Sequence, residues 1–93
     1  LTVVLAAEGY PSNPVKGRII NGLTEEELTH AWINHAGTSL NDNGEIISTG
    51  GRVLSCSATG DSLDEAAKRA YQLLETIALD GSHYRTDIGH RAL

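Results

Sequence analysis

The clearest periodic pattern in the chain lies in residues 61–79, where apolar side chains recur three and four positions apart. Such spacing places them along one face of an α-helix. Ser62 and Glu65 have the spacing of a capping box at its start, and Gly81 is suited to end it. The pattern predicts one helix of ~25 Å near residues 62–79 that packs its apolar stripe on a sheet. The stripe comprises Leu63, Ala66, Ala67, Ala70, Leu73, Leu74 and Ile77.

Shorter apolar runs in the first half of the chain predict strands. Thr2–Ala7 and Ala31–Ala36 are short, largely apolar runs, and Ile19-Ile20 is suited to begin a further strand. Trp32 is expected in the core rather than as a platform for a ligand, because no other large aromatic residue is near it in the sequence.

The stretch from His35 to Thr59 is expected to hold two strands folded back on a third. Asn41-Asp42-Asn43-Gly44 offers the tight turn of a hairpin between the first two strands. A second turn, Thr49-Gly50-Gly51, leads into the third strand, Arg52–Ala58. Strict alternation in this third strand places Arg52 on the same face as Leu54, Cys56 and Ala58.

Arg52 is therefore the one arginine expected at the start of an apolar face. A guanidinium in that position needs an anionic partner, or it must reach the rim of the fold. Two alternatives remain open at this point, namely an ion pair with a carboxylate such as Asp42, or plain solvation.

Two further segments complete the expected fold. A capping box at Thr24 and Glu27 predicts a helix of one or two turns over residues 25–28. The polar tail, residues 82–93, contains Tyr84 and Ile88 and is expected to lie over a surface. The 93 residues are therefore expected to form one small α+β domain, a mostly antiparallel sheet with one long helix packed on it.

Composition narrows the classes of partner. The formal net charge of −5 argues against nucleic acid, and no apolar run approaches the length of a membrane span. The single cysteine, Cys56, excludes an internal disulfide and fits a reducing compartment. Leu1 stands directly in a strand-like run without an initiator methionine, which is typical of a segment cut from a longer polypeptide.

The sequence contains no catalytic or metal-binding signature. Its four histidines, His30, His35, His83 and His90, do not fall at ligand spacings, and it has no phosphate-binding glycine loop. Cys56 in a strand among small residues is expected to act as a small apolar side chain rather than a nucleophile. We therefore expect no catalytic residue, no metal ligand and no cofactor site within this chain.

Six short motifs nevertheless occur in a fixed order and cover essentially the whole chain. Together they resemble the C-terminal domain of phosphoribosylamine–glycine ligase, also called glycinamide ribonucleotide synthetase. The motifs are Gly9-Tyr10-Pro11, Lys16-Gly17, His35-Ala36-Gly37-Thr38, Gly50-Gly51-Arg52-Val53-Leu54, Ala70-Tyr71 and His83-Tyr84-Arg85-x-Asp87-Ile88-Gly89-x-Arg91-Ala92.

The resemblance implies a role within a larger enzyme. The full family enzyme is a cytoplasmic ATP-grasp ligase of purine biosynthesis that joins glycine to 5-phosphoribosylamine with ATP and magnesium. Residues 1–93 would be its C-terminal domain, which is similar to that of biotin carboxylase and closes one side of the active site. ATP and magnesium would be bound by the upstream ATP-grasp and N-terminal domains, so this fragment alone is expected to be inactive.

The resemblance also implies substrate-binding residues. In related purine ligases, basic residues of the equivalent domain hold the phosphate of the substrate, and the best match here is Arg52. Gly51 would let the backbone approach phosphoribosylamine, and Lys16 is a second candidate. Arg85 and Arg91 are expected to tie the tail to this domain or to its neighbour.

Two other functions remain as alternatives. The chain could be the equivalent domain of another ATP-grasp enzyme, such as a biotin-dependent carboxylase. It could also be a non-catalytic module that binds a small anion on its own, because most of its cations lie in connecting segments.

Overall fold

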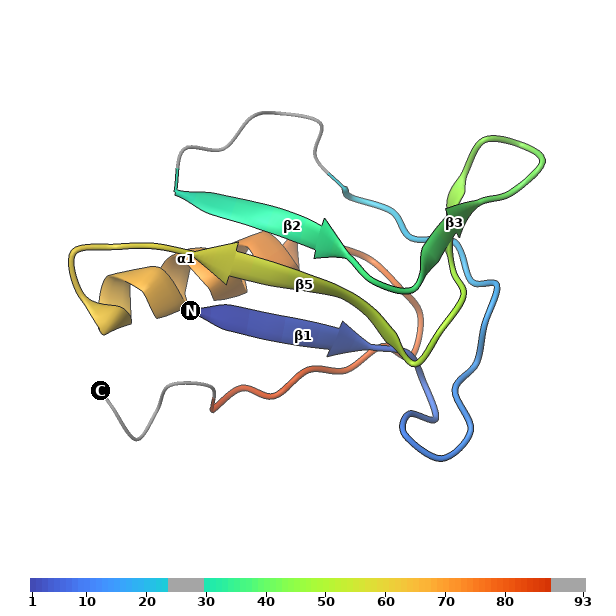
Figure 1. Ribbon diagram of the computed structural model, residues 1–93, viewed down its shortest axis with the longest axis horizontal. Helices are drawn as coiled ribbons and strands as arrows, with labels where there is room; N and C mark the ends of the chain where they lie inside the picture. The colour runs from blue at the N-terminus through green and yellow to red at the C-terminus, as the bar shows by residue number, and fades with distance from the viewer. Residues whose placement is uncertain (24–29, 88–93) are drawn as a thin grey trace.

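The computed structural model describes residues 1–23 and 30–87. Its elements are the strands β1 (Thr2–Ala6), β2 (Ala31–His35), β3 (Thr38–Leu40), β4 (Ile46–Ser48) and β5 (Arg52–Ala58), and the helix α1 (Leu63–Glu75). Strands β1, β5 and β2 form an antiparallel sheet in that order. Figure 1 shows α1 along this sheet and the β3–β4 hairpin beyond the carboxyl end of β2. The expected α+β fold is therefore confirmed.

The order of the strands differs from the prediction for residues 35–59. Strands β3 and β4 pair only with each other among the named strands, whereas β5 lies between β1 and β2. The turn itself is as expected, since the Gly44 amide donates to the Asn41 carbonyl (3.0 Å) and Gly44 has a φ of +78°. The hairpin was a local prediction, but the partners of β5 lie far away in the sequence.

Helix α1 begins as predicted and ends earlier than predicted. The Ser62 hydroxyl caps it by accepting from the Glu65 amide (3.1 Å). The helix ends at Glu75, and the Thr76 hydroxyl donates to the Leu73 carbonyl (2.7 Å). Just beyond, residue 78 pairs through its backbone with residue 21 (2.8 and 2.9 Å). This long-range bridge draws the chain out of the helix before residue 79.

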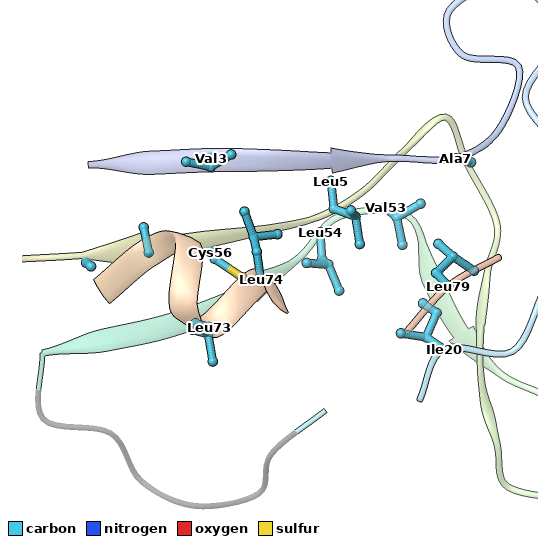
Figure 2. Close-up of a cluster of buried hydrophobic side chains, with 12 residues drawn as sticks. Val3, Leu5, Ala7, Ile20, Val53, Leu54, Cys56, Leu73, Leu74 and Leu79 are labelled. Atoms are coloured by element: carbon cyan, nitrogen blue, oxygen red, sulfur yellow. The ribbon is translucent and has the colours of Figure 1, made fainter. Parts of the chain in front are cut away.

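The core lies between the sheet and α1. Figure 2 shows its side chains, including Val3 and Leu5 from β1, Leu54 and Cys56 from β5, and Leu74 from α1. All of these side chains are 3% exposed or less. The packed layer explains why the periodic stripe of the sequence forms a helix, because the stripe is the surface that α1 buries.

Trp32 is 45% exposed, so its expected place in the core is wrong. The register explains the difference. Ile33 lies opposite the buried Cys56, whereas Trp32 lies opposite Ser57, one position along the strand. Successive residues of a strand point to opposite faces, so Ile33 points to the helix and Trp32 points away from it.

Three other expectations concern Ile19, the segments near residues 25–28 and 88–91, and the possibility of a membrane span. Ile19 makes a single bridge to Ile47 rather than beginning a strand. The short helix predicted over residues 25–28, together with Ile88 and Arg91, lies outside the described residues. Within residues 1–23 and 30–87, no helix has the length and apolar character needed to cross a membrane.

Candidate functional site

The position of Arg52 is set by a β-bulge at the start of β5. Leu5 lies opposite Leu54, but the next residue, Ala6, lies opposite Arg52, so Val53 is an extra residue in the pairing. An extra residue reverses the alternation of faces from that point on. Val53 and Leu54 are consequently both buried, while Arg52 is exposed.

This bulge corrects the sequence prediction for Arg52. Strict alternation placed Arg52 on the apolar face with Leu54 and Cys56, but the register places it with Ala6 on the face turned away from α1. The extra residue keeps its carbonyl satisfied, because the Val53 oxygen accepts from the Ala36 amide (3.0 Å) and from the Gly37 amide (2.9 Å). The long-range pairing of β5 thus brings the guanidinium to an open surface.

Arg52 borders two hollows on that surface. The larger, about 590 Å³, is lined by Arg52 together with Val4, Ala36, Gly37, Thr49, Gly50, Leu54 and Ser55. The smaller, about 270 Å³, is lined by Arg52 together with Val4, Ala6, Tyr10, His83, Tyr84 and Arg85. Among the side chains the structure describes, ion pairs involve Arg18, Lys68, Arg69 and Arg85, and none joins Arg52 to Asp42 or another carboxylate.

The glycines around Arg52 are required by close packing. A Cβ atom on Gly51 would lie 2.3 Å from Cδ2 of Tyr10, so the absence of a side chain lets the tyrosine ring lie against the turn. A Cβ atom on Gly37 would lie 2.7 Å from the Arg52 carbonyl oxygen and 3.0 Å from the Gly50 nitrogen. Gly51 therefore seats Tyr10 beside Arg52, a contact that the sequence alone did not indicate.

The segment after α1 forms the other wall of the smaller hollow. The Ala6 amide donates to the His83 carbonyl (2.8 Å) and the His83 amide donates to the Ala6 carbonyl (3.0 Å). Figure 1 shows this segment running beside β1. The Tyr71 hydroxyl also donates to the Arg85 carbonyl (2.7 Å), and the ring centroids of Tyr71 and Tyr84 are 5.9 Å apart. The expectation that the tail lies over a surface is confirmed for these residues.

Arg85 holds the tail through its backbone rather than its charge. Its guanidinium donates to both carboxylate oxygens of Asp87, at 3.0 and 2.7 Å. This hydrogen-bonded ion pair raises the pKa of Arg85. The Arg85 side chain is thus already engaged by a carboxylate, whereas no carboxylate among the described residues is paired with Arg52.

Lys16 lies in the loop between β1 and β2 and is exposed. The loop is held to β4 because the Gly17 amide donates to the Ser48 carbonyl (2.6 Å), and Arg18 forms an ion pair with Glu8. Lys16 lines neither of the two hollows beside Arg52. The structure therefore brings Gly51 next to Arg52 but does not bring Lys16 into the same hollow.

The described residues do not fit a metal or a nucleophilic centre. Within residues 1–23 and 30–87, no group of three or more His, Cys, Asp or Glu side chains is placed to hold a metal ion. Burial raises the pKa of the Cys56 thiol to about 11, which keeps it protonated near neutral pH. The imidazole of His35 hydrogen-bonds Thr38 through Nδ1 (2.9 Å) within the turn after β2.

Known proteins match this chain along almost its whole length. A family model described as "Phosphoribosylglycinamide synthetase, C domain" matches residues 1–91. The chain is 48% identical over 94 residues to the bifunctional purine biosynthetic protein purD of Dictyostelium discoideum, of which it covers 12%. It is 46% identical over 93 residues to phosphoribosylamine–glycine ligase of Yersinia pestis, of which it covers 22%.

A solved structure extends this likeness to the fold. The structure of phosphoribosylamine–glycine ligase from Thermotoga maritima superposes with a TM-score of 0.79 at 42% sequence identity, over 92% of this chain and 20% of that one. The chain thus spans about a fifth of the length of these bacterial relatives. On the family match and the shared fold, the chain belongs to the phosphoribosylglycinamide synthetase C-domain family.

Proposed function

We propose that this chain is the C-terminal domain of a cytoplasmic ligase of purine biosynthesis that joins glycine to 5-phosphoribosylamine with ATP. Relatives that carry the name of this ligase are 45 to 48% identical to the chain over nearly all of its length. They are about five times as long as the chain. This length favours the assignment of the chain as a domain of a larger enzyme over its assignment as a module that acts alone. The upstream ATP-grasp and N-terminal domains of the same polypeptide would bind ATP and magnesium.

The role proposed for this domain is to supply part of the wall that binds phosphoribosylamine. The observation that carries this role is Arg52, an exposed residue that borders two hollows, the larger of which is lined by Gly37 and Gly50. Within residues 1–23 and 30–87, no carboxylate forms an ion pair with its guanidinium. A guanidinium can donate to two phosphate oxygens at once, and glycines let the backbone come close to a ligand. Phosphate is therefore the group that this edge of the fold is best suited to bind.

Gly51 and Lys16 have secondary parts in this proposal. Gly51 acts by seating the Tyr10 ring beside Arg52, where a Cβ atom would displace it. Lys16, outside the hollows, would contribute through charge at longer range. Because solvent and salt weaken such a contribution, Lys16→Met is expected to weaken phosphoribosylamine binding less than Arg52→Met.

The fragment itself is proposed to be inactive. Phosphoryl transfer needs positioned cations and a bound magnesium ion, and the described residues hold no cluster suited to a metal. The purified 93-residue chain, incubated with glycine, phosphoribosylamine, ATP and magnesium, should form no product. ATP-dependent ligation by this chain alone would overturn the domain assignment.

The role of Arg52 is tested by Arg52→Met in the full-length enzyme. The change removes the charge but keeps an apolar stem. The phosphate does not react, so its contact should contribute equally to the ground state and the transition state. The Michaelis constant for phosphoribosylamine should rise about ten- to hundredfold with a smaller fall in kcat, as expected for one charge-assisted hydrogen bond. Arg52→Lys should recover part of the loss, because lysine lacks the two-pronged fork.

A matched control is Arg69→Met on α1. Arg69 donates to the Thr59 carbonyl (2.8 Å) and pairs with Glu65, so its role is structural. This variant should lower the melting temperature and leave all three Michaelis constants unchanged. If Arg52→Met behaves in the same way, Arg52 has no place in the substrate site.

A further inference from the structure

Three side chains stand in a row across the open face of the sheet, namely Arg52, Ala6 and His83. Ala6 pairs with Arg52 of β5 on one side and with His83 of the tail on the other. Residues that lie directly opposite in neighbouring antiparallel strands project from the same face. All three residues line the smaller hollow, which confirms that they share this face.

The size of Ala6 creates the space between the outer two residues. Neighbouring strands lie about 4.8 Å apart, so the backbones of residues 52 and 83 are separated by roughly 10 Å. In the row of paired residues the methyl group of Ala6 stands between them, and the hollow of about 270 Å³ is lined in addition by Val4, Tyr10 and Tyr84. A guanidinium and an imidazole that lean over one methyl group can both reach an anion of phosphate size held above it.

The charges around this hollow favour an anion. Its lining contains Arg52, His83 and Arg85 as basic residues and no acidic residue. Arg85 is engaged by both carboxylate oxygens of Asp87, so its charge is largely compensated. In the described part of the chain, no carboxylate is paired with Arg52 or with His83. Among the basic side chains that line this hollow, these two are therefore the ones that remain available to a ligand.

We infer that His83 is a second binding residue for the phosphate of phosphoribosylamine, acting across Ala6 from Arg52. This inference rests on the proposed function, in which Arg52 holds that phosphate. It also explains why the tail pairs with β1, because the two hydrogen bonds between His83 and Ala6 fix the imidazole at the edge of the hollow. The pairing of residues 6 and 83 thus brings Arg52 and His83, two donors that lie 31 positions apart in the sequence, to the same hollow.

The first test is His83→Leu in the full-length enzyme, with His30→Leu as the matched control. His30 is an exposed histidine whose carbonyl accepts from the Thr59 amide (2.9 Å), at the end of the sheet away from Arg52. We expect His83→Leu to raise the Michaelis constant for phosphoribosylamine about tenfold or more, with kcat and the constants for glycine and ATP little changed. His83→Gln, which retains a donor, should recover part of the loss. His30→Leu should change none of these constants.

The second test closes the hollow without altering any charge. Ala6→Val adds two methyl groups to the floor, and valine is well tolerated in strands, so β1 should keep its pairing. This variant should also raise the Michaelis constant for phosphoribosylamine, and it should weaken competitive inhibition by inorganic phosphate. It decides the question even if His83→Leu fails to fold.

The outcomes separate this inference from the proposed function. If Arg52→Met raises the phosphoribosylamine constant while His83→Leu and Ala6→Val leave it unchanged, the role of His83 is refuted and that of Arg52 stands. If His83→Leu lowers only the melting temperature, His83 is structural and the inference is equally refuted. If none of the three variants changes the Michaelis constant for phosphoribosylamine, both proposals fail.

Discussion

Replacement of Gly51 by alanine tests how the turn before β5 is built. The φ of Gly51 lies outside the left-handed region, so the cost of a side chain there comes from contact rather than from backbone strain. An added Cβ atom would lie 2.3 Å from Cδ2 and 3.0 Å from Cε2 of Tyr10. Carbon atoms in contact are normally about 3.5–4.0 Å apart, so the ring must move by about 1 Å or more. Such overpacking should destabilise the fold by about 1–3 kcal/mol.

A double-mutant cycle with Tyr10→Ala isolates this contact. Tyr10→Ala alone removes a half-buried ring and should also destabilise the chain. In Gly51→Ala/Tyr10→Ala the added methyl group no longer meets a ring, so the double variant should be less destabilised than the sum of the single variants. We expect a coupling energy of about 1–2 kcal/mol, within the usual range for residues in contact. Urea unfolding of the 93-residue chain, followed by circular dichroism, measures all four free energies.

Gly37→Ala provides the control for this cycle. Its added Cβ atom would meet backbone atoms, the Arg52 oxygen at 2.7 Å and the Gly50 nitrogen at 3.0 Å. Truncation of Tyr10 cannot relieve that overlap, so Gly37→Ala and Tyr10→Ala should be additive within about 0.5 kcal/mol. Additive effects of Gly51→Ala and Tyr10→Ala would refute the reasoning, because the ring would then not be what excludes a side chain at position 51.

Two further predictions concern the core. Because burial raises the pKa of Cys56 to about 11, the unfolded chain loses the thiol proton at a lower pH than the folded chain. The free energy of unfolding should therefore fall by roughly 2–3 kcal/mol between about pH 9 and pH 11, with the full contribution present below pH 9. Denaturant titrations across this pH range should show this additional decrease of the unfolding free energy in the native sequence and not in Cys56→Ala. An equal decrease in both proteins would contradict the prediction. Leu54→Ala, at a residue 1% exposed, should cost about 2–5 kcal/mol, whereas Leu40→Ala, at a residue 67% exposed, should cost less than about 0.5 kcal/mol. Equal shifts in the urea midpoint of these two variants would show that the core is misplaced.

The features that the sequence determined by itself are local ones. The apolar stripe and the Ser62 cap predicted α1, and Asn41–Gly44 predicted the turn of the hairpin. Each of these signals lies within a few residues of the structure it specifies, so no distant partner is needed to interpret it. The ordered motifs likewise indicated the family, which the comparisons confirmed.

Tertiary structure decided which residues meet at the candidate site. The extra residue at Val53 reverses the face of Arg52, and the pairing of His83 with Ala6 brings the tail to the same surface. Trp32 points away from the core for a related reason, since its face follows from its partner in β5. A pattern of alternation determines that neighbouring residues differ in face, but the pairing with a distant strand determines which face is buried. Long-range hydrogen bonds, rather than the order of residues along β5, therefore placed the guanidinium and the imidazole on either side of one small side chain.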